Sequence, residues 1–117
     1  MIPDSLVTTG NDLPGHRILA VKGIAKGITV RSPTIVQGFF GGFQQLFGGN
    51  LSSFTEMCDQ ARTTAYRAMI VHAFEMGGNS VIGVRFDTSS LGDRAGHEVL
   101  CYGTSVTVEL TAAEHSA

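Results

Sequence analysis

The sequence lacks several features that staple or anchor small proteins. It has no tryptophan, three prolines and only two cysteines, Cys58 and Cys101, which lie far apart. Charged residues make up 15% of the chain, compared with about 25% in an average globular protein. No apolar run approaches the roughly 18 residues of a transmembrane helix. These absences exclude a disulfide-rich scaffold and a membrane-spanning helix, and the low charge favours a protein whose surface is partly covered by other subunits.

The start of the chain does not resemble a secretory signal. Residues 1–10 contain no basic region followed by a long apolar run. We therefore expect a cytoplasmic protein, in which cysteines stay reduced and isolated cysteines are usually small buried apolar residues. The net charge of −2 gives no general attraction to nucleic acid.

The charges are unevenly distributed along the chain. Between residues 13 and 55 there are bases and no acid, and the bases are Arg17, Lys22, Lys26 and Arg31. We interpret them as solvating a strand edge or pairing with acids of the second half. Phosphate binding is the alternative, although no aromatic residue is interleaved with them and they are not clustered.

At 117 residues the chain is expected to form one domain. A domain of this length buries about two-thirds of its unfolded surface, so it needs no disulfide or metal for stability. We predict a flexible N-terminal segment over residues 1–12, a single domain over residues 13–110 and a tail over residues 111–117.

Residues 35–49 contain four phenylalanines, five glycines and no charge. Their apolar residues include a set with the spacing of one helical face, namely Val36, Phe40, Phe43 and Phe47. Each internal glycine costs such a helix about 0.8–1 kcal/mol relative to alanine, and a short helix is marginal in water. The segment must therefore be held by the rest of the fold, by a second copy or by a membrane. We favour burial in an oligomer, since the stretch is too short to span a bilayer and lacks flanking lysines.

The remaining patterns predict three strands and a second helix. The predicted strands are residues 16–31, which form one long strand or a hairpin with a bulge or turn at Lys26-Gly27, and residues 81–86 and 99–110. A capping box at Ser53 and Glu56 opens the helix, which ends at Gly77. Its apolar face is expected to carry Phe54, Cys58, Ala61, Ala65, Ala68 or Met69, His72 and Met76. The order strand, helix, helix, strand, strand predicts an α+β fold, a two-layer β-α-α-β-β unit with a small antiparallel sheet.

Several motifs match one known family from about residue 8 to residue 109. They are Thr8-Thr9, Leu46-Phe47-Gly48-Gly49, Ala61-Arg62, the run from Met76 to Asp87, and Gly103-Thr104-Ser105-Val106. On these motifs the chain resembles the YbjQ-like family, small bacterial and archaeal proteins labelled as heavy-metal-binding. The resemblance implies a dodecin-subunit-like layer assembled as a homopentameric ring, and it implies no established activity. The chain departs from the family pattern at Gly41-Gly42-Phe43 and in a polar loop expected over residues 87–96.

The family label makes soft-metal binding the first chemical hypothesis, with zinc or copper as the ion. The candidate ligands are Cys58, Cys101, His72 and His97. No two of them have the spacing of a metal-binding turn, so a site would need several loops or the ring axis, where copies of one residue converge. The alternative is that both cysteines are packed small residues and that His72 is a core or interface histidine.

Catalysis has less support in the sequence. There is no nucleophile elbow, paired-carboxylate motif or phosphate-binding loop, so an enzyme is the least expected class. Gly48-Gly49-Asn50 precedes a helix start that suits an anion, but the capping box explains the same residues. We expect an uncharacterised cytoplasmic ring, a pentamer that binds itself and neither nucleic acid nor membrane. The alternative is a scaffold, or a ring that binds a small ligand between subunits against residues 39–47.

Overall fold

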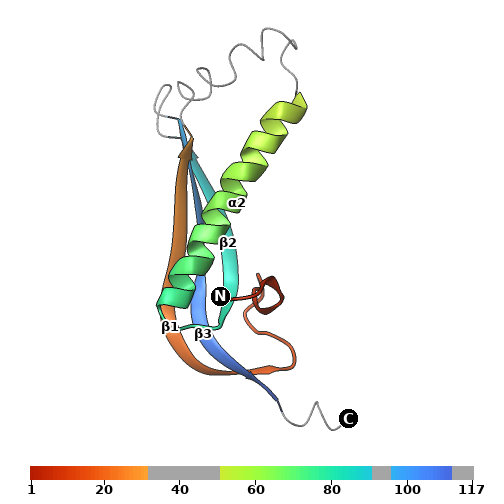
Figure 1. The fold of residues 1–117 in the computed structure, drawn as a ribbon, viewed down its shortest axis with the longest axis vertical. Coiled ribbons are helices and arrows are strands. Elements are labelled where there is room, and N and C mark those ends of the chain that lie inside the picture. Colours follow the sequence, from red (N-terminus) through yellow and green to blue (C-terminus); the bar gives the residue numbers. More distant parts are fainter. Residues whose placement is uncertain (32–50, 91–95, 112–117) are drawn as a thin grey trace.

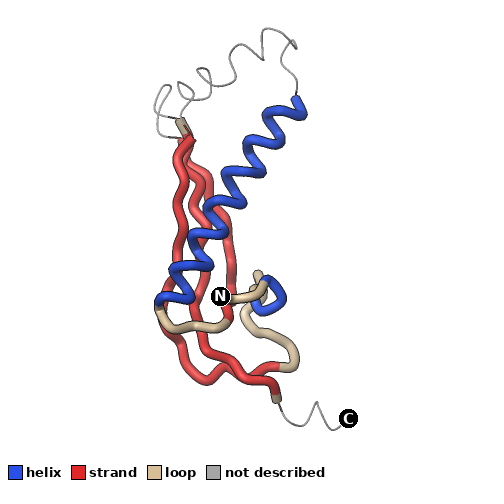
Figure 2. The backbone as a smooth tube through the Cα atoms, viewed as in Figure 1, coloured by secondary structure: helices blue, strands red, loops and turns tan. Residues whose placement is uncertain are grey.

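The structure, a computed structural model, describes residues 1–31, 51–90 and 96–111. Its elements in chain order are the 3-10 helix η1 (Asp4–Leu6), β1 (His16–Arg31), α2 (Leu51–Glu75), β2 (Ser80–Ser90) and β3 (His97–Leu110). The three strands form one antiparallel sheet in the order β1-β3-β2, and α2 crosses one face of it (Figure 1). Helix and sheet therefore make two layers, and the backbone trace shows the helix running diagonally across the strands (Figure 2).

The predicted α+β class and small antiparallel sheet are confirmed, and the element bounds differ most at the start of the helix and at the end of the second strand. α2 begins at Leu51, two residues before Ser53, where the sequence places the helix start. β2 extends to Ser90, through polar residues that the sequence assigns to a loop, because these residues pair with β3. The helix predicted over residues 34–47 lies outside the described residues. In the part of the chain that is described, no helix is long and apolar enough to cross a membrane.

β3 is the central strand and pairs along both of its edges. β1 runs antiparallel to it with two register shifts that mark bulges, and Arg31 lies opposite His97. β2 pairs with the other edge, and Ser90 lies opposite the same His97. These three residues mark one end of the sheet, which we call the upper end because it is uppermost in Figure 1.

α2 packs most closely against β1. A Cβ atom at Gly27 would overlap the Ala65 carbonyl oxygen and the Met69 amide nitrogen, so the backbones of strand and helix are in direct contact. The buried side of the helix also includes Ala61 and Ala73. Small residues at these positions permit the close approach, as the alanine spacing in the sequence predicts. The helix therefore covers the β1–β3 half of the sheet and has few contacts with β2.

The N-terminal residues, expected from composition to be flexible, contact the rest of the fold. Ile2 is buried in the core between α2 and the sheet. The hydroxyl of Tyr66 in α2 donates a 2.8 Å hydrogen bond to Asp4. Residues 7–10 then run beside the lower half of β2 and exchange backbone hydrogen bonds with residues 81–84. We call residues 7–10 the strap, since they close this part of the β2 edge.

The face of the sheet opposite α2 is only partly covered. At its lower end Leu13 packs with Val106 and Val108 in a small second core. Residues that alternate with the buried side of β1 point to this face, and above the second core they are exposed. The large apolar side chains concerned are Val21, Ile24, Ile28 and Val30 of β1 and Tyr102 of β3. We call these five residues the apolar outer face.

Candidate functional site

The glycine-rich run between α2 and β2 forms a turn that is held by internal contacts. Gly77 has a φ of 94°, a left-handed conformation that favours glycine. Gly78 lies so close to β3 that a Cβ atom would overlap the Ser105 hydroxyl. The Asn79 side chain binds both backbone groups of Val108, accepting from the amide at 2.8 Å and donating to the carbonyl at 3.0 Å. The side-chain amide of Asn79 therefore continues the hydrogen-bonded pairing with β3.

The four predicted metal ligands are spread over two elements. Cys58 is exposed on the upper turns of α2, and His72 lies further down the same helix. Cys101 is buried within β3, and His97 is exposed at the upper end of that strand. Among the described residues of one copy, no three His, Cys, Asp or Glu side chains come together in a way that could hold a metal ion. The fold does not gather the four candidates into one site within the described chain.

Cys101 has the environment of a core residue. It is fully shielded from solvent, and in the sheet register it lies between Gly27 and Phe86. Burial raises the pKa of its thiol to about 11, because a thiolate would lose its hydration there. Metal ions bind the thiolate form, so binding at Cys101 would first require an unfavourable deprotonation.

Cys58 is the accessible thiol of the two. Its spacing with Ala61 and Ala65 predicts a place on the buried face of the helix, but the structure exposes it. The neighbouring Glu56 and Asp59 are exposed as well, and Ala61 is the first buried residue among the described side chains of the helix. The upper turns of α2 thus extend beyond the core, which a helical pattern alone cannot reveal.

His72 is engaged with the backbone of β1. Its Nδ1 accepts a 3.0 Å hydrogen bond from the amide of Lys26. An amide that points to His72 cannot also point to β3, so Lys26 belongs to the residues whose backbone groups face the free edge of β1. The two residues are 46 positions apart, so the sequence carried no signal for this contact. His72 therefore lies at the edge of the sheet.

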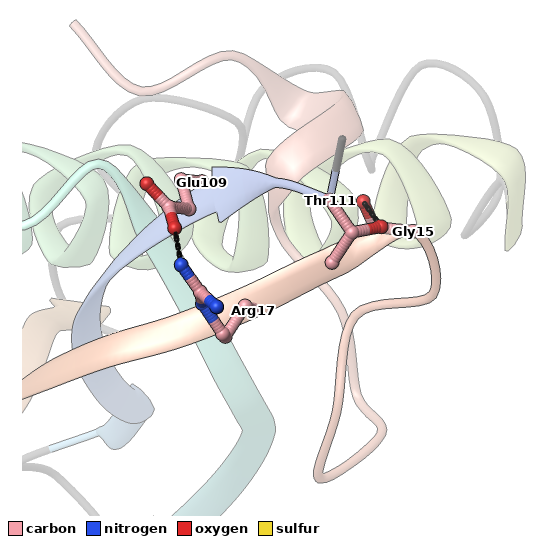
Figure 3. A network of polar contacts seen from close by, with 4 residues as sticks. All are labelled: Gly15, Arg17, Glu109 and Thr111. Atoms are coloured by element: carbon pink, nitrogen blue, oxygen red, sulfur yellow. Dashed lines mark hydrogen bonds and ion pairs between the residues drawn. The ribbon is translucent and has the colours of Figure 1, made fainter. Parts of the chain in front are cut away.

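Polar contacts tie the lower ends of β1 and β3 together (Figure 3). Arg17 forms an ion pair with Glu109, and the Thr111 hydroxyl donates to the Gly15 carbonyl at 3.3 Å. The Thr111 amide donates to the same carbonyl at 3.1 Å. This ion pair follows the expectation that bases of the first half pair with acids of the second. The other bases of β1 have no ion-pair partner within the described ranges, and they are Lys22, Lys26 and Arg31. The upper part of β1 therefore keeps unneutralised positive charge.

The apolar outer face is a surface feature that sequence reasoning did not resolve. A signal was available in β1, because Ile24 and Ile28 alternate with Ala25 and Gly27. Lys26 lies on the same side of the strand as these isoleucines, so this side is apolar except for one charge. In the described chain only the α2 side of β1 is covered, so Ile24 and Ile28 are exposed beside Lys26.

Comparison with known proteins identifies the family of this chain. A family model named YbjQ, with the description "Putative heavy-metal-binding", matches residues 5–109. The chain belongs to the YbjQ family. The resemblance inferred from the motifs is thereby confirmed, including its extent over nearly the whole chain.

Relatives in the YbjQ family carry the name UPF0145 protein. One from Chromobacterium violaceum is 47% identical over 109 residues, covering 93% of this chain and 92% of the relative. One from Burkholderia thailandensis is 48% identical over 106 residues, covering 91% and 95%. A crystal structure from Pediococcus pentosaceus, of a DUF74-family protein with unknown function, has a TM-score of 0.55 at 17% identity. The match covers 88% of this chain and 96% of the Pediococcus chain, and at this identity it supports the fold alone.

Proposed function

We propose that this YbjQ-family protein works as a homo-oligomer, a closed ring of five copies in the cytoplasm. The observation that carries the proposal is the apolar outer face, where Ile24, Ile28 and Val30 are 69%, 50% and 49% exposed. Soluble monomers rarely expose extended apolar patches. Contact between copies would remove these side chains from water, with a gain of about 25 cal/mol per Å² of apolar surface.

The proportions of the chain support the same proposal. The Cα radius of gyration is 18.2 Å, whereas a compact domain of this length is expected near 13 Å. An extended chain leaves surface that a neighbouring copy can cover. The four phenylalanines of residues 35–49 add apolar sequence that needs cover. Closed symmetric assemblies are the common solution, and the number five comes from the resemblance to the family.

Mass measurements test the assembly. Untagged protein is analysed by native mass spectrometry and by light scattering after gel filtration, at micromolar concentration. We expect one species with five times the 12.4 kDa mass of the chain. A monomer would refute the assembly, and another closed number would correct the count. An additional organic mass bound to the ring would favour the alternative, a ring that holds a small ligand between subunits.

A second candidate function is soft-metal binding, favoured by the family description and by the exposed thiol of Cys58. Thiolates favour zinc and copper among common ions. Because no three ligands meet within the described residues of one copy, a site would combine side chains from several copies. His97, also exposed, is the next candidate ligand.

The metal content of protein purified without chelator tests this second function. We expect stoichiometric zinc or copper in the wild type and its loss in Cys58→Ser. Cys101→Ser is the matched control, because it removes a buried thiol of the same size. Unchanged metal content in Cys58→Ser would remove Cys58 as a ligand, and metal-free wild-type protein would remove the function.

A further inference from the structure

The sheet has two free edges, and each is blocked in its lower part. On β1 the amide of Lys26 is occupied by His72. On β2 the strap occupies residues 81–84. Above these blocks, residues 28–31 of β1 and residues 86–89 of β2 have no outer backbone partner in the described structure.

The two open stretches match in length and position. Ile28 and Asp87 both lie opposite Leu100 of β3, so they are at the same level of the sheet. Both stretches end at the upper end, where Arg31 and Ser90 lie opposite His97. A second copy placed beside the first can therefore present one open stretch to the other at the same height.

The direction of the backbone groups follows from the antiparallel ladder. Every second residue of such a strand directs its amide and carbonyl away from the partner. Since the Lys26 amide faces the edge, the backbone groups of Ile28 and Val30 also face outward. The pairing of β3 with β2 continues the same alternation, so the backbone amides and carbonyls of Phe86 and Thr88 also point away from the sheet. Each stretch therefore offers the donors and acceptors of an unpaired strand edge.

The two stretches also differ in charge. Lys26 and Arg31 border the open part of β1 and have no acidic partner in the described ranges. Asp87 lies in the open part of β2, is exposed, and has no basic partner there either. The base below it, Arg85, is bound to the carbonyl oxygens of Thr9 and Val84. Opposite charges favour contact between unlike edges over contact between like edges.

We propose that residues 28–31 of one copy pair with residues 86–89 of the next copy, so that the sheets of neighbouring subunits join edge to edge. β1 and β2 both run antiparallel to β3 and are therefore parallel to each other. If neighbouring copies are related by rotation about an axis along the strands, the new ladder between β1 and β2 is also parallel. The two partners contribute different edges, and such a heterologous contact gives a ring when the rotation between copies closes. His72 and the strap mark the point where the ladder stops, which fixes its register. The inference rests on the proposed assembly and assigns the contact between strand edges, while burial of the apolar outer face is a separate contact of that assembly.

Proline variants test this contact without removing hydrogen bonds inside one copy. Ile28→Pro and Thr88→Pro each delete an outward amide that β3 does not use. Ile28→Ala and Thr88→Ala shorten the same side chains but keep the amide, so each is the baseline for its proline variant. By native mass spectrometry we expect both proline variants to lose the ring and Thr88→Ala to retain its mass. Ile28→Ala also removes part of the apolar outer face, so Ile28→Pro should lose more of the ring than Ile28→Ala does. Circular dichroism establishes that each variant is folded.

A mixture of the two proline variants distinguishes unlike from like edges. Ile28→Pro keeps its β2 edge and Thr88→Pro keeps its β1 edge, so the mixture should form a 1:1 heterodimer while each variant alone is monomeric. A folded proline variant that keeps the ring would overturn the inference and leave the proposed assembly intact. A monomeric wild type would refute both.

Amide hydrogen exchange in the wild-type protein gives a test that needs no variant. The amides of Ile28 and Phe86 should exchange more slowly than that of Ile24, whose outward amide lies below the position of His72. Equal exchange at the three amides would overturn the inference even if the proline variants fail to fold.

Discussion

Replacing Gly27 by alanine should destabilise the fold strongly. The added Cβ atom would overlap the Ala65 carbonyl oxygen, the Met69 amide nitrogen and the Ala68 side chain. Two of these are backbone atoms of a packed helix, which cannot rotate away as a side chain can. Overpacking costs about 1–3 kcal/mol, and contact with backbone atoms places Gly27→Ala near about 3 kcal/mol.

A loss of this size is easily measured as a change in Tm. For a chain of 117 residues, an unfolding entropy of about 2.1 cal/mol/K per residue converts about 3 kcal/mol into a fall of about 12 °C. Gly10→Ala is the matched control, because its new methyl group would meet only atoms at 3.5 and 3.6 Å. Calorimetry at one protein concentration compares the variants. If Gly27→Ala melted within about 2 °C of the wild type, the direct contact between α2 and β1 would be refuted.

Three other perturbations probe the described contacts. In the native protein a thiol reagent should modify Cys58 and leave Cys101 unmodified at neutral pH, because burial raises the pKa of the Cys101 thiol to about 11. Mass spectrometry counts the adducts, and a Cys101 adduct formed without unfolding would contradict this prediction. Asn79→Ala should lower the free energy of unfolding by about 1–3 kcal/mol, since both backbone groups of Val108 lose their partner. Urea unfolding measures this loss, and an unchanged midpoint would show that water replaces the Asn79 side-chain amide. Burial, followed by the hydrogen bond and charge of Asp4, raises the pKa of Tyr66 to about 12. The folded state therefore favours the neutral phenol, so this contribution to stability is complete below about pH 10 and is lost as the pH rises through about 12. Denaturation curves of Tyr66→Phe should therefore show a smaller loss of stability over this pH range. An identical pH dependence in both proteins would exclude this contribution of Tyr66.

Sequence reasoning succeeded where structure follows local pattern. The regular alternation of β3 and the alanine spacing of α2 are set by neighbouring residues, and both were predicted with nearly the observed bounds. The class of fold followed from the order of these elements. The family resemblance followed from motifs such as the glycine-rich turn before β2, whose residues have identifiable packing roles.

Contacts between distant parts of the chain could not be predicted. The strap lies against residues 81–84, and the polar end of β2 becomes a strand only because β3 is beside it. The same limit applies to the candidate site. Nothing in the local sequence distinguishes the exposed thiol of Cys58 from the buried thiol of Cys101, because their exposure depends on how far the helix extends beyond the sheet.

The central strand of the sheet is also the last of the three to be synthesised. β1 and β2 both depend on β3 for their long ladders, so neither ladder can form until residues 97–110 exist. Every pair between β1 and β3 joins residues separated by more than half of the chain. Such high contact order slows folding, and a nascent chain keeps the apolar β1 unpaired throughout synthesis. We therefore expect slow refolding from denaturant, in competition with aggregation, and a dependence on chaperones during synthesis.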